Sequence, residues 1–93
     1  MATYLMLGKM SLDSLTAMSA ARTEKAMALV EENGGEVKSA YALLGDSDFA
    51  LIVELPDYEQ AMKTSIGLSR LLGISFTTMP AVSIDRFDKV ILR

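Results

Sequence analysis

Residues 37–55 read VKSAYALLGDSDFALIVEL, in which two apolar runs flank the polar break Gly45-Asp46-Ser47-Asp48. Glycine adopts positive φ without a steric penalty, and Asp and Ser favour turns because their side chains bond to nearby backbone groups. The run after the break is rich in the β-branched and aromatic residues that are frequent in strands. The segment therefore predicts a β-hairpin with strands at residues 36–44 and 48–55.

The two strands of this hairpin differ in how apolar their faces are. Side chains alternate between the faces of a strand. In the second strand both faces are apolar: Phe49, Leu51, Val53 and Leu55 on one, Ala50 and Ile52 on the other. A strand with one buried face would alternate with polar residues, so we expect a central strand here. The first strand is more mixed, as an edge strand would be, with Val37, Ser39, Tyr41 and Leu43 alternating with Lys38, Ala40, Ala42 and Leu44.

Two more strands are predicted, at residues 3–10 and 74–82. The first is again apolar on both faces, with Tyr4 and Met6 on one and Leu5 and Leu7 on the other. The second contains Pro80, which lacks a backbone N–H and therefore favours an edge position or a bulge. After it, residues 83–93 predict a short amphipathic turn.

Helical signals lie between the strands. Ser11 is a candidate N-cap for a short helix or turn at residues 11–17, and a main helix is expected at about 20–33. Asp57 resembles the first residue of a capping box at the start of another helix. Gly73 ends that helix, because glycine readily adopts the left-handed conformation that follows a helix C-terminus.

The element order is therefore β-α-β-β-α-β over one domain, residues 1–93. This order predicts an α+β, ferredoxin-like fold: a four-stranded antiparallel sheet with two helices on one face. The two strands that are apolar on both faces take the central positions, so the face without helices needs a cover. A second copy, packed sheet to sheet, would close a dimeric α/β barrel and bury on the order of 600–800 Å² per partner.

The composition narrows the functional classes. The 93 residues carry a net charge of −3, no Cys and no His, and are 51% hydrophobic. No basic cluster marks a nucleic-acid interface. No run approaches the roughly 18 apolar residues that cross a membrane, and the N-terminus lacks the basic region of a signal peptide. We expect a cytoplasmic protein without a metal or cofactor, and one that binds neither nucleic acid nor membrane.

Several segments together resemble the GYD domain family, small proteins of the dimeric α/β-barrel group. The resemblance covers nearly the whole chain and rests on Met1–Tyr4, Gly8-Lys9, Gly34–Lys38, Leu44–Phe49, Glu54–Asp57 and Thr77–Ala81. In the naming motif of the family, Gly45 and Asp48 match and Ser47 replaces the tyrosine. The resemblance implies a ferredoxin-like fold, shared with ligand-binding regulatory modules and cofactor-free monooxygenases. It implies no established biochemical function.

Four residues are candidates for ligand binding. Asp46 and Asp48 are a close acidic pair that suits a general base or cation ligand, although turn formation and backbone capping are favoured over either role. Tyr41 offers a hydroxyl to a cavity, against the more usual role of packing its ring. Arg22 can bind a ligand carboxylate with two hydrogen bonds. A solvated arginine at the start of the helix, or one bonded to a neighbouring loop, is the favoured role.

Two functional hypotheses remain open at this point. The first is a non-catalytic homo-oligomer that binds a small molecule or acts in regulation, and it is favoured because His and Cys, common catalytic groups, are absent from the sequence. The second is a small dimeric barrel enzyme, a cofactor-independent monooxygenase or isomerase. It would use Asp48, Tyr41 or Arg22 in a pocket between sheet and helices. A ligand-sized pocket lined by a perturbed carboxylate would favour the enzyme.

Overall fold

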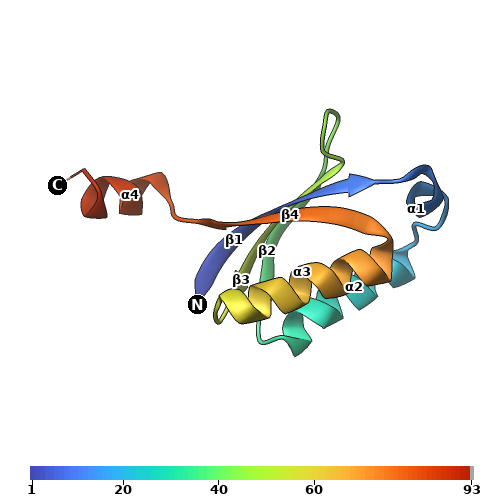
Figure 1. Ribbon diagram of the computed structural model, residues 1–93, viewed down its shortest axis with the longest axis horizontal. Coiled ribbons are helices and arrows are strands. Elements are labelled where there is room, and N and C mark those ends of the chain that lie inside the picture. The colour runs from blue at the N-terminus through green and yellow to red at the C-terminus, as the bar shows by residue number, and fades with distance from the viewer. Residues whose placement is uncertain (93) are drawn as a thin grey trace.

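Four antiparallel strands form one sheet in the order β2-β3-β1-β4, and helices α2 and α3 lie side by side on one of its faces (Figure 1). The structure is a computed structural model that describes residues 1–92. Its elements in chain order are β1 (Ala2–Met10), α1 (Leu12–Thr16), α2 (Ala20–Glu32), β2 (Glu36–Ala42), β3 (Phe49–Leu55), α3 (Tyr58–Leu72), β4 (Ile74–Ala81) and α4 (Ile84–Val90). The predicted α+β, ferredoxin-like order is confirmed.

Side-chain caps begin the helices where the sequence predicted them. Ser11 and Asp57 each accept a hydrogen bond from the backbone N–H three residues on, as N-cap residues do. Ser19 does the same for α2, which fixes the break between the short and the main helix. Gly73 ends α3 with φ of 65°, a left-handed conformation that glycine adopts without a Cβ clash.

The core lies between the sheet and the two helices, and the central strands β1 and β3 supply much of it. Its fully buried side chains include Met6, Val53, Leu55 and Leu68. The predicted central positions of these two strands are confirmed by their pairing, since each has a partner strand on both sides. β2 and β4 are the edge strands, which also explains why Pro80 is tolerated in β4.

One prediction about β2 is wrong. The register shifts between Val37 and Ser39, so Lys38 is an extra residue that breaks the simple alternation. Val37 pairs with Val53 and faces the helices, whereas Ser39 and Tyr41 pair with Ile52 and Ala50 on the opposite face. Val37 and Ser39 therefore do not share a face.

The sheet face opposite the helices, here called the open face, has an apolar centre. Two rows of side chains cross it: Leu5 lies between Ile52 and Met79, and Leu7 lies between Ala50 and Thr77. Polar residues flank these rows toward both strand ends, Thr3 and Glu54 at one and Lys9 and Ser75 at the other. Because β1 and β3 are apolar on both faces, as predicted, the open face carries an apolar patch at its centre.

The C-terminal segment forms an arm that extends from the body of the molecule (Figure 1). β4 leads through Val82 and Ser83 into α4, which stands apart from the sheet and the other helices (Figure 1). The chain consequently measures 49 Å along its longest axis and only 18 Å along its shortest. The predicted amphipathic segment at 83–93 is helical over most of its length, and its last residue lies outside the described part of the chain.

Candidate functional site

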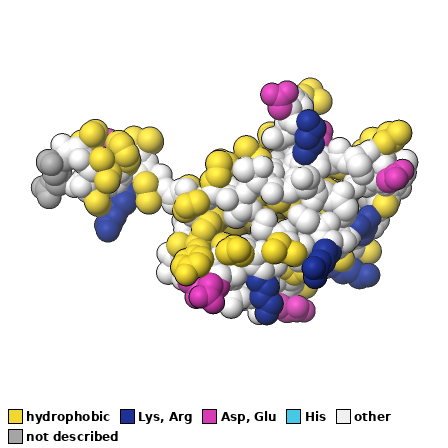
Figure 2. Space-filling model, in the orientation of Figure 1, with side chains coloured by type: hydrophobic (Ala, Val, Ile, Leu, Met, Phe, Trp, Pro, Cys, Tyr) yellow, Lys and Arg dark blue, Asp and Glu magenta, His cyan; other side chains and the backbone are white. Residues whose placement is uncertain are grey.

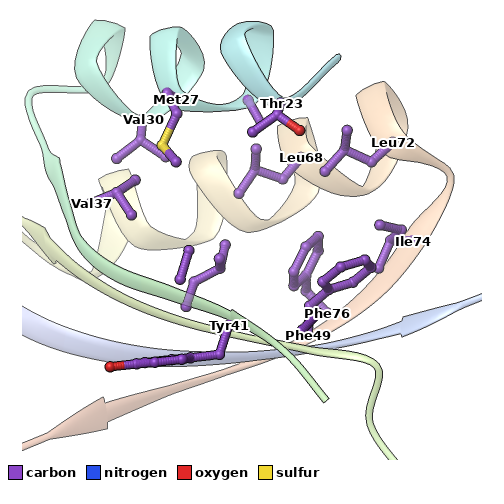
Figure 3. Close-up of a pocket in the computed structure, with 14 residues that line it drawn as sticks. Thr23, Met27, Val30, Val37, Tyr41, Phe49, Leu68, Leu72, Ile74 and Phe76 are labelled. Atoms are coloured by element: carbon purple, nitrogen blue, oxygen red, sulfur yellow. The ribbon is translucent and has the colours of Figure 1, made fainter. Parts of the chain in front are cut away.

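A cavity of about 210 Å³ lies between α2, α3 and the helix-facing side of the sheet (Figure 3). Its lining combines five secondary-structure elements: Thr23, Ala26, Met27 and Val30 from α2; Val37, Ala40, Tyr41 and Ala42 from β2; Phe49 and Leu51 from β3; Leu68 and Leu72 from α3; Ile74 and Phe76 from β4. A cavity of about 150 Å³ suffices to hold benzene, so this one has room for a small one- or two-ring molecule.

Small side chains create the space. Ala26 on α2 faces Ala40 and Ala42 on β2, and a methyl group at each of these positions leaves the region between helix and edge strand underfilled. The interior end is closed by buried Val30 and Leu68, whereas the alanines of β2 are exposed. The mouth therefore opens between α2 and the edge strand β2.

The cavity is almost wholly apolar. Within residues 1–92, its lining holds two hydroxyl side chains, Thr23 and Tyr41, and no carboxylate, ammonium or guanidinium group. An apolar cavity favours an apolar ligand, because a polar molecule would lose its hydrogen bonds to water on entry. The lining as described supplies no group that is usual as a general base near neutral pH.

Tyr41 is the one predicted site residue that lines this cavity, and it does so from the rim. Its side chain is 59% exposed, and its register places it on the open face of the sheet. Figure 3 shows the Tyr41 ring lying along the sheet, apart from the side chains that line the cavity from α2 and α3. The hydroxyl is thus placed for solvent or a partner surface rather than for the cavity interior.

Asp48 serves the backbone at the end of β1. Its Oδ2 accepts a hydrogen bond of 2.7 Å from the Met10 amide, and its own N–H donates to Gly8 O at 2.8 Å. Its carbonyl accepts from Leu43 N at 2.7 Å, which closes the hairpin loop. Asp48 therefore ties the hairpin to the central strand, in line with the structural role favoured from the sequence.

Replacing Asp48 with alanine is expected to lower the free energy of unfolding by about 1–2 kcal/mol, because the half-buried Met10 amide loses its acceptor. Asp48→Asn keeps an acceptor oxygen at the same place and should retain most of the stability. Urea unfolding of both variants measures the difference. If the asparagine variant were the less stable of the two, the negative charge rather than the hydrogen bond would be what Asp48 contributes.

Arg22 and Asp46 lie elsewhere. Arg22, in the first turn of α2, donates from its guanidinium to Leu71 O and to Ala17 O, the latter at 3.4 Å. Leu71 lies in the last turn of α3, where carbonyl groups have no partner within the helix, so Arg22 satisfies one of them and joins the two helices. Asp46 is exposed in the hairpin loop. The structure does not gather the four candidate residues into one site.

The residues that line the cavity were missed as a site by reasoning from the sequence. Ala40 and Ala42 alternate on the helix-facing side of a strand, although alanine is depleted in strands. That pairing of small residues was the available signal. It could not be interpreted without knowing that the bulge at Lys38 turns both alanines toward α2.

Two further features are absent from residues 1–92, a cluster of metal-binding side chains and a membrane-spanning helix. These residues contain no group of three or more Asp, Glu, His or Cys side chains that could hold a metal ion. In the same part of the chain, no helix has the length and apolar character to cross a membrane.

Comparison with known proteins gives a family and a fold. The family model of the GYD domain matches residues 4–91. The crystal structure of the leucine response regulatory protein of Mycobacterium tuberculosis is similar, with a TM-score of 0.59 and 11% sequence identity over 88% of this chain and 51% of that one. This chain thus spans about half the length of that solved chain, and the likeness at such low identity concerns the fold alone. No curated protein matches the chain.

Proposed function

This chain belongs to the GYD domain family, and we propose that it is a non-catalytic homo-oligomeric module that binds a small apolar molecule. The observation that carries the proposal is the cavity between α2, β2 and α3. It has a defined volume of about 210 Å³, a nearly apolar lining and a mouth at an edge strand. Ligand pockets are typically apolar with a few polar groups at defined points. Here the Thr23 hydroxyl is the polar side-chain group of α2 in the lining, and Tyr41 lies at the rim.

The proposed assembly packs the open faces of two copies against each other. Their apolar centre, around Leu5, Leu7 and Ile52, with polar residues beyond it, has the arrangement of a protein interface with a core and a rim. A two-fold axis across the strands would set the end that carries Glu54 over the end that carries Lys9 in the second copy, a favourable pairing of charge. This packing would close the dimeric α/β barrel.

A regulatory use is the second half of the proposal. Its support is the shared fold with a protein whose name describes a regulatory response to leucine. In this chain, binding at the cavity would link α2 to the edge strand β2, and Tyr41 of β2 also reaches the open face. A ligand would therefore touch an element that belongs to both the cavity and the proposed interface.

The alternative is a small barrel enzyme with its active site in the same cavity. The position between sheet and helices is the one that such an enzyme would use. Of the residues expected to perform its chemistry, Tyr41 lines the cavity, whereas Asp48 and Arg22 are hydrogen-bonded to backbone groups outside it. Turnover of a bound probe, followed by mass spectrometry, would favour the enzyme over the binding module.

Filling the cavity is expected to abolish ligand binding. Ala40→Phe places a ring between β2 and α2, and a strand accepts phenylalanine well, so the fold should persist. With indole, toluene and other small apolar probes, the wild-type chain should gain about 2.7 kcal/mol of stability at a probe concentration of 100 Kd, and the variant should gain none. Thermal unfolding measures both.

The matched control is Ala28→Phe, which adds the same ring to an exposed position of α2 outside the cavity lining. It should bind the probes as the wild type does. The proposal fails if no apolar probe stabilises the wild-type chain, or if Ala40→Phe responds to the probes as strongly as Ala28→Phe.

A further inference from the structure

The C-terminal arm, defined as residues 82–92, presents a large apolar surface. More than half of the surface of Val82, Ile84, Val90, Ile91 and Leu92 is exposed, and Phe87 is 39% exposed. Six neighbouring side chains of this kind make an apolar patch on the order of several hundred Å², the size that marks an interaction site on a soluble protein. Figure 2 shows the arm with apolar side chains on its surface, away from the body of the molecule.

A groove of matching character lies on the body, between α3 and β4. The α3–β4 groove has a volume of about 360 Å³ and is lined by Tyr4, Tyr58, Ala61, Met62, Ser65, Ile66, Thr78 and Pro80. Tyr58, Met62 and Ile66 are more than half exposed and lie four residues apart along α3. Side chains at this spacing form a single apolar ridge on one side of a helix. A helix–strand groove with such a ridge fits a second amphipathic helix.

We propose that the C-terminal arm of one copy binds in the α3–β4 groove of a second copy, and that the second arm returns the contact. Ile84 and Phe87 of α4 and Ile91 at its C-cap are spaced at i, i+3 and i+7, the spacing of one side of a helix. That stripe can interdigitate with the ridge of α3, as ridges pack into grooves between helices. Each copy supplies one arm and one groove, so the contact is complete with two copies.

The geometry of the arm favours a second copy over the arm's own groove. Ser83 has φ of −64° and ψ of 154°, the extended conformation that is usual for an N-cap, so α4 begins directly after the strand with a two-residue link. Figure 1 shows α4 beyond the end of β4, on a line that leads away from α3. An arm that leaves its own body in this way can reach the groove of a neighbour.

Charge favours a protein partner over a membrane surface. By sequence, residues 82–93 contain two acidic side chains, Asp85 and Asp88, and three basic ones, Arg86, Lys89 and Arg93, so the side chains of this segment carry a net charge of only +1. Asp85 and Lys89 also pair with each other at 3.2 Å. Helices that lie on anionic lipid are rich in Lys and Arg on their polar side.

Engineered cysteines test the contact in the full chain, whose native sequence has none. Phe87→Cys and Met62→Cys are both at exposed positions, so each variant should fold. When the two single variants are mixed, one of them isotopically labelled, and oxidised, a disulfide should join them into a mixed dimer. The control pair, Phe87→Cys with Ala28→Cys on the exposed side of α2, should give at least tenfold less mixed product.

Three outcomes are distinguishable by mass. A mixed dimer well above the control supports the exchange of arms. A double variant, Phe87→Cys with Met62→Cys, that oxidises within one chain at low concentration would show the arm on its own body and overturn the proposal. Mixed product no greater than the control overturns it as well. Because neither cysteine lies in the cavity or on the open face, these results stand apart from the proposed ligand binding and sheet pairing.

Discussion

Glutamate in place of Ile52 is expected to convert the proposed sheet-to-sheet dimer to monomers. Ile52 sits at the centre of the open face, beside Leu5 and opposite Ser39 of β2. In a sheet-to-sheet dimer the new carboxylate would be buried without a partner, which costs about 3–5 kcal/mol. Each of the two copies in a two-fold dimer would bury one such carboxylate, so association should weaken by about a thousandfold or more. Light scattering over a concentration series measures the change.

The same substitution should leave the monomer folded, because in a separate copy the glutamate faces water and the core on the other side of β3 is untouched. Circular dichroism checks this. Ala28→Glu adds an equal charge to an exposed position of α2 and should not change the mass. A wild-type chain that is already monomeric at high concentration, or an Ile52→Glu variant of unchanged mass, would remove the open face as an interface.

Alanine in place of Gly35 is expected to lower the free energy of unfolding by about 3 kcal/mol, at the upper end of the range for overpacking. A Cβ added at Gly35 would lie closer than 3.0 Å to the backbone oxygen of Glu54 and to the side chain of Leu55. The backbone oxygen belongs to the central strand β3 and Leu55 is fully buried, so neither can move freely. In a chain of this size, each kcal/mol corresponds to a shift of roughly 4–8 °C in Tm.

Gly34→Ala is the matched control for this prediction. Gly34 has φ of 83°, a conformation that costs an L-residue roughly 1–2 kcal/mol. A Cβ added at Gly34 would have the edge of the Pro56 ring as its nearest neighbour, at 3.1 Å. Gly35→Ala should therefore be the more destabilising of the two, by thermal or urea unfolding. The reverse order would show that backbone conformation, rather than the close approach to β3, sets the requirement for glycine in this turn.

Signals within a few residues were enough to predict much of the fold. Ser11 and Asp57 cap helices because a side-chain oxygen reaches an amide three residues away, which is a local interaction. The apolar residues on both faces of 4–7 and 49–53 indicated the central strands, because alternation along a strand depends only on the chain itself. The order of the elements is compatible with few ways of connecting the strands in one sheet, and the structure has the ferredoxin-like one.

Local signals failed where two distant segments meet. The faces of β2 were wrongly assigned, since the bulge at Lys38 arises from pairing with β3 and leaves no mark in the alternation of side chains. Arg22 and Asp48 were candidate ligand residues, but each bonds to a backbone group far along the chain, Leu71 O and Met10 N. Of the four candidates, Tyr41 alone lines the cavity, and it does so at the rim.

The sequence by itself determined the kinds of element, their order and the two strands that occupy the middle of the sheet. These properties depend on side-chain periodicity and capping, which act over a few residues. Only the tertiary structure decided the cavity behind Ala40 and Ala42 and the outward course of the arm after Ala81. A cavity is the volume that five packed elements leave unfilled. The direction of an arm depends on which contacts it makes with the rest of the molecule. Neither is a property of any single stretch of residues.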